Sequence, residues 1–173
     1  VRKRRGAIDF DLPESKIELD ERGQVKSVRT AERLVTHKII EECMIAANVE
    51  AAKRINKGRI PSLYRVHEGP DADRLEELVL FLRTFGHKVN PAKLSPKEIN
   101  RVLASVVGKP EEELVETVVL RSMKQARYQP NNVGHFGLAL GAYAHFTSPI
   151  RRYPDLLVHR AIKHLNDKRS PKG

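Results

Sequence analysis

The chain has 173 residues, and its 32 Lys and Arg against 22 Asp and Glu give a formal net charge of +10. This length fits one domain with a buried core, and the positive charge favours a polyanionic partner, with nucleic acid ahead of an anionic membrane. A single cysteine, Cys43, excludes a disulfide framework and paired metal-ligating cysteines. No run approaches the roughly 18 apolar residues that span a bilayer, so we expect a soluble, cytoplasmic chain with no membrane partner.

The first part of the chain is expected to contain a small sheet. Residues 1–29 carry the alternating segments AIDFDL, KIEL and VKSV, with the turn-forming DERG between the last two, which predicts an antiparallel β-meander. Residues 30–127 are expected to be mainly helical. A long amphipathic helix is predicted over residues 32–56, with Thr30 as its candidate N-cap, and a brief strand over residues 63–67.

Three further helices have clear boundary signals. One opens at residues 69–70, Gly-Pro, and ends at Gly86. The next begins at Ser95, which forms a capping box with Glu98 around a first-turn proline. The third starts at Pro110, where three glutamates meet the positive end of the helix dipole.

The last third of the chain is predicted to be less regular. Residues 128–147 are rich in Gly and Asn and should form a loop with one short strand. A final helix is expected over residues 148–168, bent by Pro154. The predicted fold is therefore α+β, mostly helical with a small antiparallel sheet near the N-terminus. The start without Met and the polar end KRSPKG suggest that residues 1–173 were cut from a longer protein.

The densest cluster of polar and aromatic side chains is YAHFTSPIRRYPD, where a predicted helix start coincides with Arg151 and Arg152. A helix N-terminus and guanidinium groups both favour phosphate. Because successive helical residues point about 100° apart, the two arginines should not face one ligand in the same way. The alternative is that Arg151 only forms a surface ion pair with Asp155.

Four strings resemble the ribonuclease II/R family of exoribonucleases, and the ribonuclease R type more than the ribonuclease II type. They are RGAIDF, IIEECMIAAN, LRSMKQARY and GHFGLALGAYAHFTSPIRRYPDLLVHRAIKHL. The match runs in register from about Arg5 to Leu165 and corresponds to the C-terminal half of the RNB catalytic domain. The resemblance implies processive 3′-to-5′ hydrolysis of RNA to nucleoside 5′-monophosphates.

The same resemblance implies Mg²⁺ held by a cluster of aspartates in an earlier stretch of the domain. This sequence has no such cluster, since Asp9 and Asp11 only flank Phe10 and Asp71 and Asp73 sit by a helix start. We therefore assign no metal ligand here and expect the isolated chain to be inactive. The seven histidines show no HExxH or Cys/His spacing, so zinc is not expected.

Residue by residue, the resemblance implies three roles. Arg151 matches the catalytic arginine that binds the scissile phosphate and stabilises developing negative charge. Phe10 matches an aromatic residue that stacks on the terminal base, the alternative being an inward-facing strand residue. Glu41 matches a glutamate that recognises the ribose 2′-hydroxyl, while Glu42 is the weaker candidate; one of the pair is expected to be merely solvated.

Five more residues are expected to contact RNA or to brace Arg151, although each would also suit a structural role: His135, Tyr143, His145, Ser148 and Arg152. The implied partners are the 3′ end of single-stranded RNA and the rest of a parent nuclease, namely the first half of its catalytic domain and its cold-shock and S1-type barrels. The rival hypotheses are a non-catalytic RNA-binding module and a helical interaction domain. An aspartate cluster upstream would separate the first rival from the nuclease.

Overall fold

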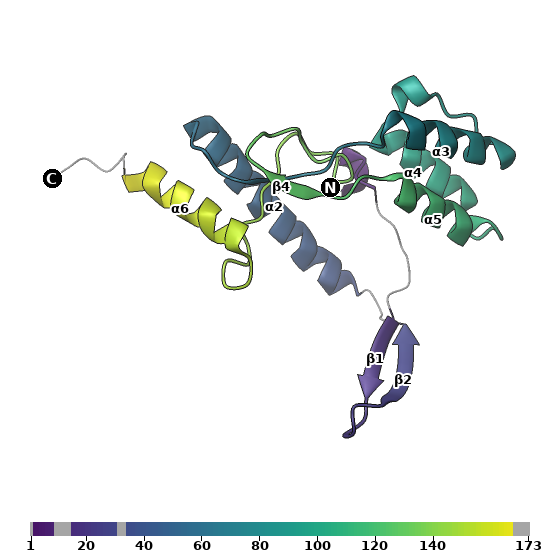
Figure 1. Ribbon diagram of the computed structural model, residues 1–173, viewed down its shortest axis with the longest axis horizontal. Helices are drawn as coiled ribbons and strands as arrows, with labels where there is room; N and C mark the ends of the chain where they lie inside the picture. Colours follow the sequence, from purple (N-terminus) through teal and green to yellow (C-terminus); the bar gives the residue numbers. More distant parts are fainter. Residues whose placement is uncertain (1, 9–14, 31–33, 168–173) are drawn as a thin grey trace.

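The structure is a computed structural model that describes residues 2–8, 15–30 and 34–167. It is an elongated α+β molecule, as predicted, with three stacked helices at one end, a pair of long helices at the other and a hairpin that projects from the middle (Figure 1). In chain order the elements are α1 (Arg2–Arg5), β1 (Ser15–Leu19), β2 (Val25–Thr30), α2 (Val35–Gly58), β3 (Tyr64–Val66), α3 (Ala72–Thr84), the 3₁₀ turn η1 (Pro91–Lys93), α4 (Pro96–Val106), α5 (Glu112–Ser122), β4 (Arg127–Gln129) and α6 (Tyr153–Asp167).

The predicted meander is a two-stranded antiparallel hairpin in the described residues, β1 with β2. Its turn is closed by Asp20, whose carboxylate accepts hydrogen bonds from the backbone N–H groups of Arg22 and Gln24. The first segment, AIDFDL, lies mostly outside the described residues, and a short helix precedes it. Thr30 is not the N-cap of the long helix, because it pairs with Ser15 at the end of the hairpin; Leu34 occupies the cap of α2.

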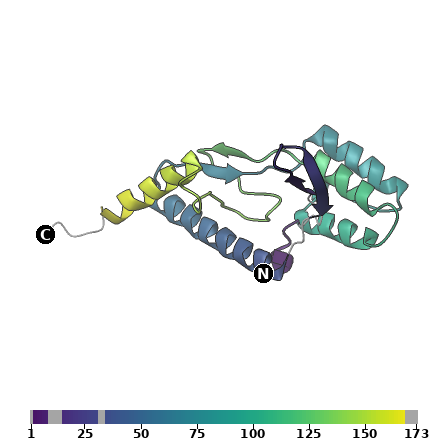
Figure 2. The same ribbon diagram turned by 90° about the horizontal axis from the view of Figure 1, so that it is seen from below.

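The α2 and α6 helices pack together against a second small sheet, in which β3 pairs antiparallel with β4. Small side chains on α2 let α6 come close: Ala51 and Ala52 are buried in this core, and a Cβ added at Gly58 would lie 2.5 Å from a methyl group of Leu165. The α2–α6 core consists of Ala51, Ala52, Ile55, Tyr64, Val66, Ala144, Val158 and Ala161. Figure 2 shows the β3–β4 pair between these two helices and the three-helix end.

The three-helix end has a core of its own, built from one apolar face each of α3, α4 and α5. Ser95 caps α4 as predicted, its hydroxyl accepting from the Glu98 N–H at 3.3 Å. The following helix begins at Glu112, two residues after Pro110, because residues 107–111 form turns. No helix within the described ranges is long and apolar enough to cross a membrane.

The final helix starts later than predicted. Residues 149–151 form a turn and α6 begins at Tyr153. Pro154 therefore lies in the first turn of the helix, where its missing N–H costs no hydrogen bond, and it has no reason to bend the helix. This late start leaves Arg151 in the turn ahead of α6 rather than on the helix.

Candidate functional site

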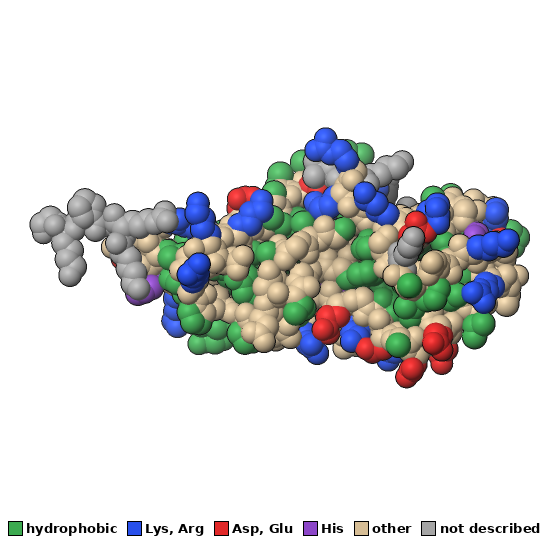
Figure 3. Space-filling model, turned by 90° about the horizontal axis from the view of Figure 1, so that it is seen from above, with side chains coloured by type: hydrophobic (Ala, Val, Ile, Leu, Met, Phe, Trp, Pro, Cys, Tyr) green, Lys and Arg blue, Asp and Glu red, His purple; other side chains and the backbone are tan. Residues whose placement is uncertain are grey.

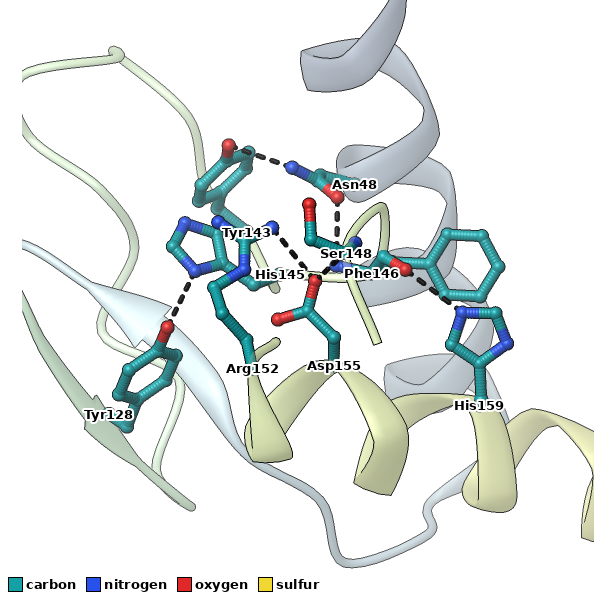
Figure 4. Close-up of polar contacts among 9 residues, drawn as sticks. All are labelled: Asn48, Tyr128, Tyr143, His145, Phe146, Ser148, Arg152, Asp155 and His159. Carbon is teal, nitrogen blue, oxygen red and sulfur yellow. Dashed lines mark hydrogen bonds and ion pairs between the residues drawn. The ribbon is translucent and has the colours of Figure 1, made fainter. Parts of the chain in front are cut away.

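The candidate site is the turn from Ser148 to Arg152, at the N-terminal end of α6 (Figure 4). The Ser148 carbonyl accepts hydrogen bonds from the backbone N–H groups of Arg151 at 3.3 Å and Arg152 at 3.1 Å. The N–H of Ser148 donates to Oδ2 of Asp155 at 2.8 Å. The N–H and the carbonyl of Ser148 are thus both hydrogen-bonded, and the backbone of Arg151 is held by the bond to that carbonyl.

The two neighbouring arginines do different things. Nη2 of Arg152 donates to Oδ2 of Asp155 at 2.8 Å, and Asp155 is fully buried. The alternative ion pair between Arg151 and Asp155 was wrong, because the tight turn directs Arg152 at that carboxylate instead. Arg151 is exposed, and its side chain makes no hydrogen bond or ion pair with any described residue.

The segment before the turn is held between α2 and α6. Asn48, only 3% exposed on α2, donates from Nδ2 to the Tyr143 hydroxyl and accepts at Oδ1 from the Phe146 N–H, both at 2.9 Å. On the other side, the ring of His159 from α6 stacks on the Phe146 ring with centroids 4.0 Å apart. The His159 Nε2 lies 2.9 Å from the Phe146 carbonyl, to which it donates in the matching tautomer.

A chain of ring contacts connects the candidate site to β3 and β4. Neighbouring rings in this ring cluster lie 5.0 to 5.7 Å apart, and its members are His67, His135, Tyr143, His145 and Tyr128. The Tyr128 hydroxyl and His145 Nδ1 lie 2.6 Å apart, which suits donation from the phenol to a neutral imidazole. The guanidinium of Arg65 lies 4.8 Å above the Tyr128 ring, a cation–π geometry.

The imidazoles of this cluster are held neutral. Burial lowers the pKa of His145 to about 4, with further lowering by the positive charges of Arg152, Arg65 and Arg151 that outweighs the opposing effect of Asp155. Burial also lowers the pKa of His135 to about 4, and His67 and Arg65 add to this. The neutral rings can therefore accept hydrogen bonds near pH 7, as His135 Nδ1 does from the Leu138 N–H at 3.2 Å.

The third imidazole, His67, is fixed at both ring nitrogens. Its Nδ1 accepts from the Gly137 N–H at 2.9 Å, and its Nε2 donates to the Lys124 carbonyl at 2.7 Å. Burial lowers the pKa of His67, and the hydrogen bond to Lys124 only partly opposes this. The ring thus ties the loop after β4 to the end of the helical region.

The remaining predicted residues are Glu41 and Glu42, which lie on α2, and Phe10. Glu41, on α2, has a side chain 43% exposed and receives a hydrogen bond from Arg2 at 2.7 Å. Glu42 also pairs with Arg2, at 2.9 Å, so the expected contrast between one engaged and one merely solvated glutamate is not seen. Phe10 lies outside the described residues.

The structure therefore gathers Tyr143, His145, Ser148 and Arg152 around the turn that carries Arg151 (Figure 4). The His135 ring packs edge-on against the Tyr143 ring at a centroid distance of 5.3 Å. Asn48 was missed by the sequence analysis. The signal was present, because Asn48 is a polar residue at a core position of α2, in register with Ile45, Ala52 and Ile55.

In the described ranges of the chain, no three or more His, Cys, Asp or Glu side chains lie together so that they could hold a metal ion. The described residues therefore do not fit a multi-carboxylate magnesium site. Asp9 and Asp11 lie outside those ranges.

Comparisons of this chain with family models and with curated proteins point to the same family. The family model for the RNB domain matches residues 1–168. Ribonuclease R of Aquifex aeolicus (strain VF5) is 50% identical over 159 residues, which cover 91% of this chain and 23% of that protein. Ribonuclease R of Escherichia coli (strain K12) is 44% identical over 166 residues, covering 95% of this chain and 20% of that protein. The chain thus spans about a fifth of the length of the curated relatives it matches.

A solved structure has the same fold. It is Mycoplasma genitalium RNase R in complex with ribose methylated single-stranded RNA. The TM-score is 0.89 at 30% sequence identity, and the match covers 98% of this chain and 27% of that one.

Proposed function

We propose that this chain, which belongs to the RNB domain family, is part of a cytoplasmic exoribonuclease that degrades RNA hydrolytically and processively from its 3′ end. The proposed products are nucleoside 5′-monophosphates. Support comes from the relatives named Ribonuclease R and from the neighbour whose structure contains single-stranded RNA. Because those relatives are much longer, we assign the complete activity to a parent protein that also carries the rest of the catalytic domain and cold-shock and S1-type barrels.

The observation that best supports a phosphate-handling site is the contrast between Arg151 and Arg152. Arg152 is occupied by the buried Asp155 carboxylate, whereas Arg151 is exposed without a partner in the described part of the chain. An unpaired guanidinium ahead of a helix N-terminus suits a phosphate, because both contribute positive potential and N–H donors. We therefore assign to Arg151 the contact with the scissile phosphate and stabilisation of its developing charge.

The charge of the surface agrees with an RNA partner. Lys and Arg side chains are spread along the face in Figure 3, and several of the Asp and Glu side chains in view lie along one edge toward the three-helix end. Contacts with the phosphate backbone release counterions, which provides affinity for any RNA sequence. We assign the half-buried His145 and Ser148 to the RNA path, and the buried Tyr143 and the ring of His135 behind it to the support of that path.

Two further assignments follow the family resemblance alone. Glu41 is proposed to recognise a ribose 2′-hydroxyl, and its partly exposed carboxylate is compatible with that role. Phe10 is proposed to stack on the terminal base. For Arg152 we propose a supporting rather than a direct role, because its guanidinium is used by Asp155.

We place the magnesium ligands in an earlier stretch of the parent's catalytic domain, since no described group of residues here fits them. In the parent protein, Mg²⁺ would supply activation of the attacking water and stabilisation of the leaving oxygen. The residues of this chain would then position the RNA and neutralise phosphate charge. We accordingly expect no hydrolysis by the isolated chain.

The test is digestion of a 5′-labelled single-stranded RNA in the presence of Mg²⁺. We would compare the isolated chain, the natural protein that contains it, and that protein with Arg151→Ala. Arg160→Ala is the matched control, because Arg160 is exposed on α6 and has no partner among the described residues. We expect stepwise shortening only by the longer protein, with kcat lowered about 10²- to 10³-fold by Arg151→Ala and RNA affinity little changed.

Different outcomes would reject different parts of the proposal. If Arg151→Ala behaves like Arg160→Ala, Arg151 does not handle the scissile phosphate. Shortening of RNA by the isolated 173 residues would show that they contain a complete metal site. A longer protein that binds RNA and never shortens it would favour the non-catalytic RNA-binding module.

A further inference from the structure

We infer that Asn48 on α2 and Asp155 on α6 are positioning residues that together hold Arg151 where it meets phosphate, an assignment that rests on the proposed function. Neither residue touches the exposed Arg151 side chain through a hydrogen bond among the described contacts. Both are almost fully buried, and each accepts a hydrogen bond from a backbone N–H of the segment that leads into the Arg151 turn, Asn48 from Phe146 and Asp155 from Ser148 (Figure 4).

Asp155 reaches Arg151 through one intervening residue. Its Oδ2 accepts from the Ser148 N–H at 2.8 Å, and the Ser148 carbonyl accepts from the Arg151 N–H at 3.3 Å. A carboxylate that is 0% exposed is costly to bury unless it is paired and hydrogen-bonded. Here the buried charge fixes a turn outside α6, so its effect is on the shape of that turn.

Asp155 also controls which arginine is available. Its carboxylate binds Arg152, which is adjacent in sequence to Arg151 and only 21% exposed. If Asp155 lost its charge, the Arg152 guanidinium would lose its partner and could compete with Arg151 for the same phosphate. The carboxylate therefore selects a single guanidinium for the ligand, in addition to shaping the turn.

Asn48 holds the other end of the same segment. Its amide uses both polar atoms, one on the Tyr143 hydroxyl and one on the Phe146 N–H, and this fixes the chain just before Ser148. Asn48 lies seven residues after Glu41, two turns along the same side of α2. The amide thus also sets the spacing between the proposed ribose contact and the proposed phosphate contact.

The test is a double-mutant cycle on kcat in the natural protein that contains this chain, with Asp155→Asn and Arg151→Ala made singly and together. Asn lacks the charge that holds Arg152 but keeps the size of the side chain. We expect Asp155→Asn to lower kcat about 10- to 100-fold, as for a misplaced catalytic group, with the Kd for single-stranded RNA changed less than about threefold. The double variant should be no less active than Arg151→Ala, because Asp155 acts by placing Arg151 and by keeping Arg152 from the phosphate, and once Arg151 is absent neither loss can lower kcat further.

A merely structural role would give another pattern. Loss of folded protein would multiply with the effect of Arg151→Ala, so additive effects of the two substitutions on the logarithm of kcat would overturn the inference. An unchanged kcat in Asp155→Asn would overturn it as well. Circular dichroism melts of each variant, with Arg160→Ala as control, would show whether folding is retained.

Asn48→Leu provides a second approach, should Asp155→Asn fail to fold. Leu has a similar volume and makes neither hydrogen bond, so the segment would be released from α2 rather than from α6. The same cycle with Arg151→Ala is expected to be non-additive, and additivity would again overturn the inference. If Arg151→Ala itself leaves kcat unchanged, the proposed function and this inference both fail. If Arg151→Ala lowers kcat but Asp155→Asn and Asn48→Leu leave it unchanged, only this inference fails.

Discussion

Acidification should destabilise this fold through two imidazoles of the ring cluster, those of His135 and His145. Burial lowers the pKa of each ring from 6.5 to about 4. Between these values the unfolded chain binds protons that the folded chain does not. The stabilisation is therefore fully present above pH 6.5 and is lost as the pH falls toward 4.

The expected size of the effect follows from the two pKa values. One pKa unit corresponds to about 1.4 kcal/mol, so lowering the pH from 7.5 to 5 costs about 2 kcal/mol for each ring. Solvent partly reaches both rings, and screening reduces the cost to about 1 kcal/mol each. Protonation also has a local consequence, because a second donor at His135 Nδ1 would face the Leu138 N–H that this nitrogen accepts from.

The measurement is urea denaturation followed by circular dichroism at pH 7.5 and pH 5, at one ionic strength. In the unsubstituted chain, the unfolding free energy should fall between pH 7.5 and pH 5. His135→Gln and His145→Gln should each make that fall smaller by about 1 kcal/mol. His164→Gln, on the exposed side of α6, is the control. If both cluster variants lose as much stability on acidification as the unsubstituted chain, the rings are not held neutral by the fold.

Three other predictions can be checked in the same denaturation assay at pH 7.5. Ile55→Ala should cost about 2–5 kcal/mol, because Ile55 is 0% exposed in the α2–α6 core, whereas Ile150→Ala, at 98% exposure, should change stability by less than about 0.5 kcal/mol. Ser95→Ala should cost about 1 kcal/mol through loss of the α4 cap; no change would refute the capping bond. Gly134→Ala should cost more than Gly23→Ala: both glycines have positive φ, but only at Gly134 would the new Cβ lie 3.0 Å from a backbone carbonyl.

Local signals in the sequence were reliable where a single residue decides a boundary. The Ser95 capping box placed the start of α4 correctly, since the cap needs only neighbouring residues. The prediction of Thr30 as the N-cap of the long helix was wrong because a contact distant in sequence decides its position. Its suitability as a cap is local, but its pairing with Ser15 depends on the register of a hairpin that begins fifteen residues earlier.

The sequence predicted which segment of the chain forms the candidate site, but not the contacts among its residues. The sequence analysis singled out the string around Arg151, and the alternative that it left open paired Asp155 with Arg151, whereas the structure pairs it with Arg152. That pairing depends on α6 beginning at Tyr153, whereas the sequence analysis expected the helix from residue 148, with Pro154 as a bend inside it. The bonds from Asn48 join positions about a hundred residues apart, so only the packing of α2 on α6 could reveal them.

The placement of the Arg151 turn makes its geometry depend on one of the two cores more than on the other. Both anchors, Asn48 and Asp155, belong to helices of the α2–α6 core, where Gly58 leaves no room for an added methyl group without displacement of Leu165. The core of α3, α4 and α5 contributes none of the hydrogen bonds that hold Ser148 or Phe146. A cavity in the three-helix end should therefore lower stability and leave Arg151 in place, whereas a shift of α6 on α2 would move both anchors relative to each other and displace the guanidinium.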